Sequence, residues 1–322
     1  MQIRIYFLAI YLMVGSLLSG CGPSDKNNAN KNEIKGSVSI SGAFALYPLT
    51  VKWADEFQKL HPGIRIDISA GGAGKGMADA LSEMVDLGMF SRSISPEEKA
   101  QGCWWIAVAK DAVLPTVNAN NPWLDQLKKT GISREVFENI YLSDKKLDWN
   151  EIVKTNEKHS LNVYTRSDAC GAAQMWGEFL GKDQESLGGI GVFGDPGMAD
   201  AVKRDRFGIG YNNVIYVYDL KTRKCYEGLE VIPIDLNDNR KIDEDENFYS
   251  TIDEIMMAIG DEKYPSPPAR DLYFVANGKP KNMATLLFLN WVLSGGQNLV
   301  NDAGYVWLSE GKIQSERLKL NP

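Results

Sequence analysis

The feature that most constrains the fold of this chain is a repeated succession of a short strand-like run, a turn of small residues and a helical stretch. Segments that alternate in this way are typical of α/β proteins, in which helices pack on a sheet. The succession occurs at "SVSISGAFALYPLTVKWADEFQKLHPG", "IRIDISAGGAGKGMADALSEM", "VDLGMFSRSISPEEKAQG" and "LNVYTRSDACGAAQMWGEFLG". The sequence therefore predicts an α/β fold.

Local signals mark where several of these helices begin and end. Pro48 lies near the start of the first helical stretch, and Pro62 with Gly63 ends it. Ser95 is a predicted helix cap, and Pro96 takes the first helical position after it. The apolar residues of the first stretch follow helical spacing at Leu49, Trp53, Phe57 and Leu60.

Each small-residue turn leads into a helix whose first backbone N–H groups have no partner inside the helix. These groups lie at the positive end of the helix dipole, so an anion is their natural ligand. Glycine and alanine allow a ligand to approach the backbone closely. The alternative is that each turn is a tight strand-to-helix connection that needs small residues for packing alone.

Arginine and serine side chains stand at the same turns. Arg166 and Arg92 would each offer a planar pair of donors, which suits an oxyanion better than the point charge of a lysine. Ser41, Ser91 and Ser167 are candidate hydroxyl donors. The alternatives are surface ion pairs for the arginines and backbone capping for the serines.

The overall composition limits the classes of function. With 322 residues, 44% of them hydrophobic, the chain is long enough for a large core and for two lobes. The formal net charge of -7 argues against a broad surface that neutralises nucleic-acid phosphates. We expect no nucleic-acid partner, and any anion site must depend on a local positive charge.

The N-terminal segment has the pattern of an export signal. Arg4 precedes the apolar run "IYFLAIYLMVGSLL", so residues 1–20 are predicted to be a signal peptide. The following "LSGC" is similar to a bacterial lipoprotein processing site, which would leave Cys21 as a lipidated N-terminus. An ordinary signal or a membrane anchor is the alternative. Residues 21–33 are polar and are predicted to be a flexible tether.

The order of motifs along the whole predicted mature chain resembles the phosphate-binding proteins of bacterial ABC importers. These proteins are a branch of the two-lobed periplasmic binding proteins of type II. The resemblance rests on "SGAFALYPLTVKWADEFQK", "SAGGAGKGMADAL", "VDLGMFSRSIS", "RSDACGAA", "YPSPPARDLYFVANGKP" and "FLNWVLSGGQNLVNDAGYVWLSE". It implies two lobes, each a mixed sheet flanked by helices, with a ligand in the cleft between them.

Several pocket positions depart from the pattern of that family. The family's Thr-Phe pair falls on Phe44 and Ala45, its second-loop serine on Gly72, and its acceptor aspartate on Ser91. Its Arg-x-x-x-Ser-Gly-Thr loop keeps Arg166 and Gly171 but has Cys170 for serine and Ala172 for threonine. Asp168 is a candidate replacement for the acceptor. The predicted ligand-binding residues are Ser41, Gly42, Ala43, Phe44, Ala45, Gly71, Gly72, Ala73, Gly74, Ser91, Arg92, Arg166, Asp168, Cys170, Gly171 and Ala172.

A second motif has the spacing of a calcium loop. "DLNDNRKIDEDE" is similar to an EF-hand loop, and the candidate ligands are Asp235, Asn237, Asn239, the Lys241 carbonyl, Asp243 and Glu246. Arg240 stands where glycine normally makes the sharp turn. The alternative is an acidic solvated loop, and any calcium would be structural. We expect no required cofactor.

Other classes of function compete with ligand binding. His61 and His159 are the only histidines, and neither stands beside a plausible nucleophile in the sequence. Cys170 at a helix start near Arg166 could be an activated thiol, although a packing role is preferred. The chain is therefore predicted not to be an enzyme. A metal-dependent phosphatase, a binding protein for a different ligand, and a lipid-tethered structural protein are the alternatives.

The domain expectation follows from the resemblance. Residues 34–113 with 266–322 are predicted to form the first lobe, and residues 114–265 the second. The resemblance implies a monomer that binds phosphate or a related oxyanion and docks on an ABC permease of the inner membrane. The predicted location is the periplasm or another extracytoplasmic face, where the lipid would hold the chain at the membrane. Cys103, Cys170 and Cys225 cannot all pair within one chain.

Overall fold

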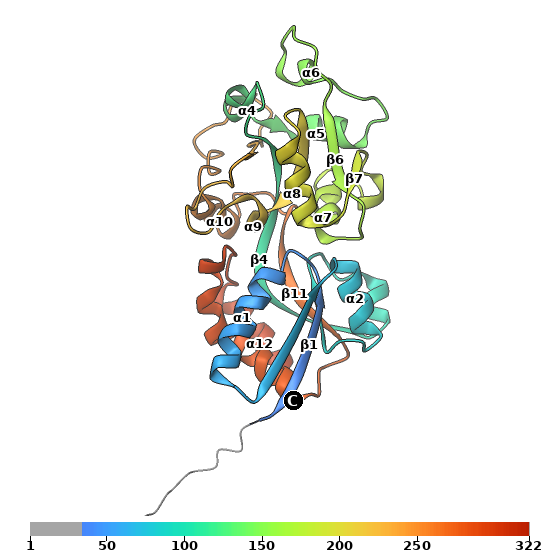
Figure 1. Ribbon diagram of the computed structural model, residues 1–322, viewed down its shortest axis with the longest axis vertical. Coiled ribbons are helices and arrows are strands. Elements are labelled where there is room, and N and C mark those ends of the chain that lie inside the picture. Colours follow the sequence, from blue (N-terminus) through green and yellow to red (C-terminus); the bar gives the residue numbers. More distant parts are fainter. Residues whose placement is uncertain (1–33, 322) are drawn as a thin grey trace, which may run out of the picture. The chain divides into compact units, whose positions relative to one another are not determined.

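The computed structural model describes residues 34–321, and strands and helices alternate along them (Figure 1). The main sheet has the order β2-β1-β3-β11-β4-β8-β6-β7, and β9 also pairs with β4. Its strands are β1 (Gly36–Gly42), β2 (Ile64–Ala70), β3 (Leu87–Phe90), β4 (Cys103–Asn118), β6 (Asn162–Arg166), β7 (Ile190–Val192), β8 (Gly208–Asn213), β9 (Leu229–Val231) and β11 (Ala269–Asn277). The predicted α/β class is confirmed. The predicted signal peptide, Cys21 and the tether lie outside the described residues.

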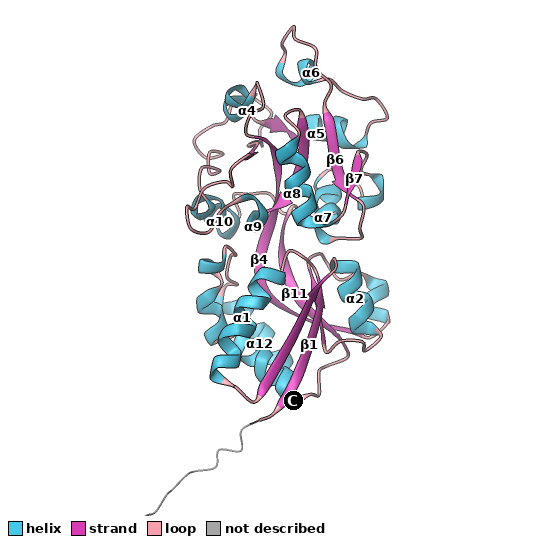
Figure 2. Ribbon diagram, viewed as in Figure 1, coloured by secondary structure: helices cyan, strands magenta, loops and turns pink. Residues whose placement is uncertain are grey.

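Helices connect and flank these strands (Figure 2). The α-helices are α1 (Tyr47–Leu60), α2 (Ala73–Leu81), α3 (Pro96–Ala100), α4 (Leu124–Thr130), α5 (Arg134–Leu142), α6 (Trp149–Val153), α7 (Gly171–Phe179), α8 (Gly194–Arg204), α9 (Val214–Val217), α10 (Ile252–Gly260), α11 (Met283–Val292) and α12 (Glu310–Leu320). Short 3-10 helices are η1 (Gln184–Ser186), η2 (Gly295–Leu299) and η3 (Asn301–Ala303). The strands β5 (Ile132–Ser133) and β10 (Ile234–Asp235) form a separate parallel pair.

The expected helix signals are observed where the sequence places them. Pro48 stands in the first turn of α1, and the helix stops at Leu60 before Pro62. Ser95 and Glu98 form a reciprocal capping box at the start of α3, in which each side chain accepts from the other residue's backbone N–H. These local rules held because each depends on neighbouring residues only.

The pairing directions decide where the small-residue turns lie. β1 runs parallel to β2 and to β3, and β6 runs parallel to β7 and β8. β11 is antiparallel to β3 and β4, and β4 is antiparallel to β8 and β9. Since parallel neighbours end at the same edge of a sheet, the turns after β1, β2 and β3 lie together.

Two hydrophobic cores share the strands β4 and β11. The first core contains Trp53, Phe57, Phe274 and Phe288, while the second contains Phe137, Tyr141, Trp149 and Trp176. Along β4 the buried side chains belong to the first core up to Ala109 and to the second from Ala112. β4 therefore crosses from one core to the other, and β11 crosses between Leu272 and Ala269. The lobe boundaries given above stay a prediction.

Two further observations concern export and cysteine pairing. None of the helices described between residues 34 and 321 has both the length and the apolar character required to span a membrane. Cys103, Cys170 and Cys225 are all free thiols. The fold of the described residues therefore depends on packing and hydrogen bonding rather than on disulfides.

The first core generates a prediction about Trp53, which joins α1 to η2. Its side chain is fully buried, and its indole Nε1 donates to the Gly296 carbonyl oxygen at 2.8 Å. Trp53→Phe keeps an aromatic ring but leaves that buried carbonyl without its donor. We expect a loss of about 1–3 kcal/mol in the free energy of unfolding, measured by denaturant titration. Trp307→Phe, at an exposed position, is the control and should change it by less than about 0.5 kcal/mol.

Candidate functional site

The four small-residue turns come together in the structure. The Gly74 backbone N–H donates to the Ala169 carbonyl oxygen at 3.1 Å, which joins the second turn to the fourth. A Cβ atom added to Gly171 would lie 2.1 Å from the Ser91 carbonyl oxygen, so the third turn also touches the fourth. The first turn contacts α9, because the Phe44 carbonyl accepts from the Tyr216 hydroxyl at 3.0 Å.

Many backbone amides of these turns already donate to the chain itself. Ala43 donates to Met89, and Gly71 and Gly72 both donate to Gly42, over 2.9 to 3.1 Å. The Cys170 N–H donates to the side-chain oxygen of Gln184 at 3.0 Å. These four amides therefore bond within the protein. That other amides of the turns face a ligand stays a prediction.

Arg166 lies at the centre of these turns and is held by two carboxylates. Its Nε and Nη2 atoms donate to the two carboxylate oxygens of Asp168 at 2.8 and 2.6 Å. Its Nη1 atom lies 2.8 Å from Oδ2 of Asp195. Only 1% of the Arg166 side chain is exposed. Burial lowers the pKa of this guanidinium, but the nearby carboxylates outweigh burial, and the net shift is upward.

Asp195 connects Arg166 to groups that the sequence prediction missed. Asn213 at the end of β8 donates its amide to Oδ1 of Asp195 and accepts from Nη2 of Arg270. Arg270 on β11 also lies 3.4 Å from Oδ2 of Asp111 on β4, and its Nη1 donates to the Gly171 carbonyl at 3.4 Å. A buried polar network thus runs from β6 through α8 and β8 to the two strands that both cores share.

Burial controls the electrostatics of this network. Burial raises the pKa of Asp111 to about 7, although the positive charge of Arg270 acts to lower it. Burial also raises the pKa of Asp195, while Arg166 lowers it. The pKa of Arg270 is lowered by burial, against the carboxylates of Asp111 and Asp195. All three directions favour the neutral form of a group removed from water.

The remaining predicted side chains make other contacts. Ser41 donates its hydroxyl to Asp79 at 2.6 Å, within the first core. Arg92 forms a bidentate pair with Glu98 at 2.7 and 3.1 Å and stacks over Phe90. The structure therefore places Ser41 and Arg92 in ion and hydrogen-bond pairs of their own. The buried members of the turns that supply packing are Ala43, Ala45, Ala73, Cys170 and Ala172.

Two glycines are needed because the turns approach so closely. Gly72 has φ +90°, and an added Cβ would lie 3.1 Å from both the Ala169 carbonyl and the Asp168 carboxylate. Gly171 has no room for a side chain against Ser91. Phe44 lies with its ring centroid 5.9 Å from the Arg166 guanidinium and 6.0 Å from the Phe193 ring. Phe44 therefore lies between Arg166 and the exposed ring of Phe193.

The Cys170 thiol does not have the environment of a nucleophile. It is buried, and it accepts from the Ala173 N–H at 3.4 Å as the cap of α7. Burial raises the pKa of Cys170 to about 12, against Arg166, which lowers it. The thiol is thus protonated at neutral pH, and the preferred interpretation as a packing thiol fits this environment.

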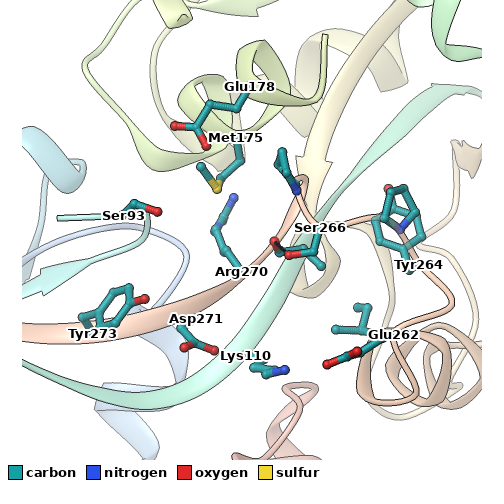
Figure 3. Close-up of a pocket in the computed structure, with 14 residues that line it drawn as sticks. Ser93, Lys110, Met175, Glu178, Glu262, Tyr264, Ser266, Arg270, Asp271 and Tyr273 are labelled. Carbon is teal, nitrogen blue, oxygen red and sulfur yellow. Dashed lines mark hydrogen bonds between the residues drawn. The ribbon is translucent and has the colours of Figure 1, made fainter. Parts of the chain in front are cut away.

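A cavity of about 610 Å³ adjoins the network (Figure 3). Figure 3 shows Arg270 between Met175 of α7 and Ser266. Nε of Arg270 is buried without a hydrogen-bond partner in the described structure. The wall also contains ionisable groups of both signs, namely Lys110, Glu178, Glu262 and Asp271. The cavity has room for a small organic molecule.

The predicted calcium loop has a tightly bonded backbone. The Asp235 carboxylate accepts from the backbone N–H groups of Asn239 and Arg240 at 3.2 and 2.8 Å. Arg240 has φ +60°, the left-handed conformation normally given to glycine at this place. Among the described residues, no cluster of three or more His, Cys, Asp or Glu side chains is arranged to hold a metal ion. Calcium binding stays a prediction.

Known proteins are similar to this chain over nearly its whole length. Residues 27–295 match the model of the PBP superfamily domain. A phosphate-binding protein PstS of Xylella fastidiosa (strain 9a5c) is 25% identical, with 97% of each chain covered. PstS of Methanocaldococcus jannaschii is 24% identical, over 96% of this chain and 92% of that protein. The resemblance to phosphate-binding proteins of ABC importers is thus confirmed.

Solved structures show the same fold. A substrate-binding protein from Clostridium perfringens with bound phosphate has a TM-score of 0.69 and 20% identity, over 85% of this chain and all of that one. An ABC-type phosphate transport receptor from Vibrio cholerae has a TM-score of 0.61 and 17% identity, over 84% of this chain and all of that one. The predicted fold, that of the type II periplasmic binding proteins, is confirmed.

The raised pKa of Asp111 predicts how stability depends on pH. A carboxyl with a folded pKa of about 7 and an ordinary value of 3.8 binds its proton more tightly in the folded state. Its contribution to stability is complete below the ordinary pKa and is lost as the pH rises through 7. We expect the free energy of unfolding to fall by about 1 kcal/mol between pH 6 and pH 8.

Denaturant titration at several pH values checks this expectation. Asp111→Asn should flatten the dependence, because amides do not titrate. Asp67→Asn, at a position with a 53% exposed side chain, should leave the dependence as it is in the wild type. A wild-type stability that rises from pH 6 to pH 8 would contradict the assignment.

Proposed function

Because this chain belongs to the PBP superfamily, we propose that it is the solute-binding component of an ABC importer and that it binds inorganic phosphate or a related small oxyanion. The observation that carries the proposal is the buried guanidinium of Arg166 at the meeting point of four turns. Two of these turns lead into helices of eight or more residues in the first core, and one into such a helix in the second. The near full-length similarity to phosphate-binding proteins supports the choice of ligand.

The proposal includes the location and partners of the protein. Export and lipidation at Cys21 would hold the chain at the extracytoplasmic face of a membrane, through the tether of residues 21–33. A monomer would then deliver its ligand to a membrane permease. The "LSGC" pattern supports the lipidation, and the similarity to PstS proteins supports the transport role. Binding rather than catalysis is proposed, and the protonated Cys170 thiol supports that choice.

The ligand would lie between the two cores, next to Arg166. A guanidinium is planar and always charged, so it can bind two oxygens of a tetrahedral anion at once. Gly72 and Gly171 would let the turns pack closely enough to enclose such a ligand beside Arg166. Cys170 and Ala172 stand where the resemblance implies serine and threonine hydroxyls. The charge of Arg166 would therefore contribute more of the binding free energy than it does in a site with those hydroxyls.

The cavity beside Arg270 favours a second candidate ligand. Its volume of about 610 Å³ falls in the range of sites for small organic molecules and exceeds what inorganic phosphate needs. Arg270 lies in its wall and could bind an anionic group, while the mixed charges of Lys110, Glu178 and Asp271 suit a polar body. An organic phosphate or another organic oxyanion is therefore the alternative.

Arg166 provides the direct test of the proposal. We expect Arg166→Ala to reduce phosphate affinity at least about 100-fold, because it removes the bidentate charged donor. Isothermal titration calorimetry with inorganic phosphate, and in parallel with glycerol 3-phosphate, measures the loss and separates the two ligand classes. Arg166→Ala could fail to fold, because it leaves two buried carboxylates without a positive charge. Arg166→Lys keeps that charge and is therefore the second variant to measure.

The matched control is Arg92→Ala. Arg92 is paired with Glu98 at the start of α3, so its removal should lower the affinity by less than about threefold. Phosphate affinities that are equal in the wild type and in folded Arg166 variants would overturn the proposed site. Binding of glycerol 3-phosphate without binding of inorganic phosphate would favour the second candidate.

We also propose a structural calcium ion in the loop of residues 235–246. The sequence pattern supports it, and so does the left-handed backbone at Arg240. Calcium at 1 mM should then raise the melting temperature relative to the same protein in chelator, since a ligand that binds only the folded state stabilises it. Glu246→Gln should abolish this shift, whereas Glu244→Gln, outside the ligand positions, should keep it. An unchanged melting temperature would contradict the prediction.

A further inference from the structure

The carboxylate of Asp195 lies where an anion would meet Arg166. Nε and Nη2 of Arg166 are engaged by Asp168, and Nη1 faces Oδ2 of Asp195 at 2.8 Å. The side chains of both partners are buried, with 1% of Arg166 and 4% of Asp195 exposed. The guanidinium is thus surrounded by carboxylates of the chain itself, and water has almost no access to the contact.

The charges around Asp195 leave no surplus of positive charge. The cationic groups that face it are Arg166 from β6 and Arg270 from β11, while the anionic groups are Asp168 after β6 and Asp111 from β4. Together with Asp195 itself, three carboxyl groups stand against two guanidinium groups, and one of the three, Asp111, has a pKa raised to about 7. The other titratable groups that face this cluster are Cys170 at the start of α7, Tyr216 of α9 and Tyr305 after η3.

Asp195 is also held firmly in place. It follows Gly194, which begins α8 with a φ of +73°. Gly194 also lies against the Phe44 ring. The Asn213 amide donates to Oδ1 of Asp195, and Arg270 fixes the orientation of that amide by donating to its oxygen. The carboxylate therefore occupies one defined position beside Nη1 of Arg166.

We infer that Asp195 is an internal competitor for the oxyanion, and that its carboxylate must be protonated or displaced before an anionic ligand can bind Arg166. The inference rests on the proposed function and names the residue that would set the affinity and pH range of that site. An anion added beside the carboxylates of Asp168 and Asp195 meets repulsion in a site of low dielectric constant. Loss of one negative charge removes part of that repulsion.

The sign of the pH effect follows from linkage. An anion bound beside Asp195 disfavours its ionised form, so the complex holds more protons than the ligand-free protein. Affinity for the ligand should therefore rise as the pH falls. The already raised pKa of Asp195 makes this proton uptake easier.

The test is Asp195→Asn, which keeps the shape of the side chain and removes its charge. Inorganic phosphate is titrated into the full chain by calorimetry at pH 5.5 and pH 8.0, in two buffers of different ionisation enthalpy. We expect Asp195→Asn to bind phosphate at least about tenfold more tightly than wild type at pH 8.0. The wild type should take up protons on binding, and the variant should take up fewer.

The matched control is Asp200→Asn, on the exposed side of the same helix. Asp200 pairs with Arg204 and has a 55% exposed side chain, so this variant should bind phosphate as the wild type does. A thermal melt of each variant confirms that it is folded.

The outcomes separate this inference from the proposed function. Phosphate binding by the wild type, with equal or weaker binding by folded Asp195→Asn at pH 8.0, would overturn the inference and leave the proposed function standing. Binding by neither protein at either pH would overturn both. Tighter binding by the variant, with fewer protons taken up, would support both.

Discussion

The burial of the Arg166 guanidinium between Asp168 and Asp195 is the interaction on which the rest of the site depends. A buried charge is tolerated only when it is paired and hydrogen-bonded, and removal of one partner costs about 3–5 kcal/mol. The two carboxylates therefore fix the end of β6, the turn before α7 and the first turn of α8 relative to one another. Asn213 extends this constraint to Arg270, on a strand that contributes to both hydrophobic cores.

The proposed site differs in its chemistry from the pattern that the resemblance implies. Cys170, Ala172, Gly72 and Ser91 replace the hydroxyl and carboxyl groups expected from that resemblance. In their place stands a network of ionised and amide groups, in which each member binds another member. Neutral hydroxyls recognise a ligand by the geometry of its hydrogen bonds, whereas fixed charges act mainly through its net charge. Ligand choice in this chain should thus depend more on charge and pH than on the pattern of hydroxyls.

Sequence reasoning succeeded where the signal is local. The strand-turn-helix units and the Ser95 cap each depend on residues that are close in sequence. The sequence predicts Asp168 as an acceptor for the ligand, whereas the structure pairs it with Arg166. Asp195 opens a helix in a similar unit, "VFGDPGMADAVK", and the same rule would have found it. Asp111 lies in the middle of β4, Asn213 ends β8, and Arg270 is the second residue of β11, so only the pairing of those strands brings them together. The bonding of the turn amides to neighbouring turns likewise depends on tertiary packing.

The position of Arg270 explains why the network and the adjoining cavity cannot be treated as independent. One guanidinium donates to Asn213, lies against Asp111, contacts the Gly171 carbonyl and lines the cavity. Its buried Nε has no hydrogen-bond partner among the described groups. An unpaired buried donor of this kind destabilises the folded state. Any shift of Arg270 toward the cavity would loosen the Asn213 amide, and that amide positions the Asp195 carboxylate. The polar wall of the cavity and the charged groups at Arg166 are therefore connected through a single side chain.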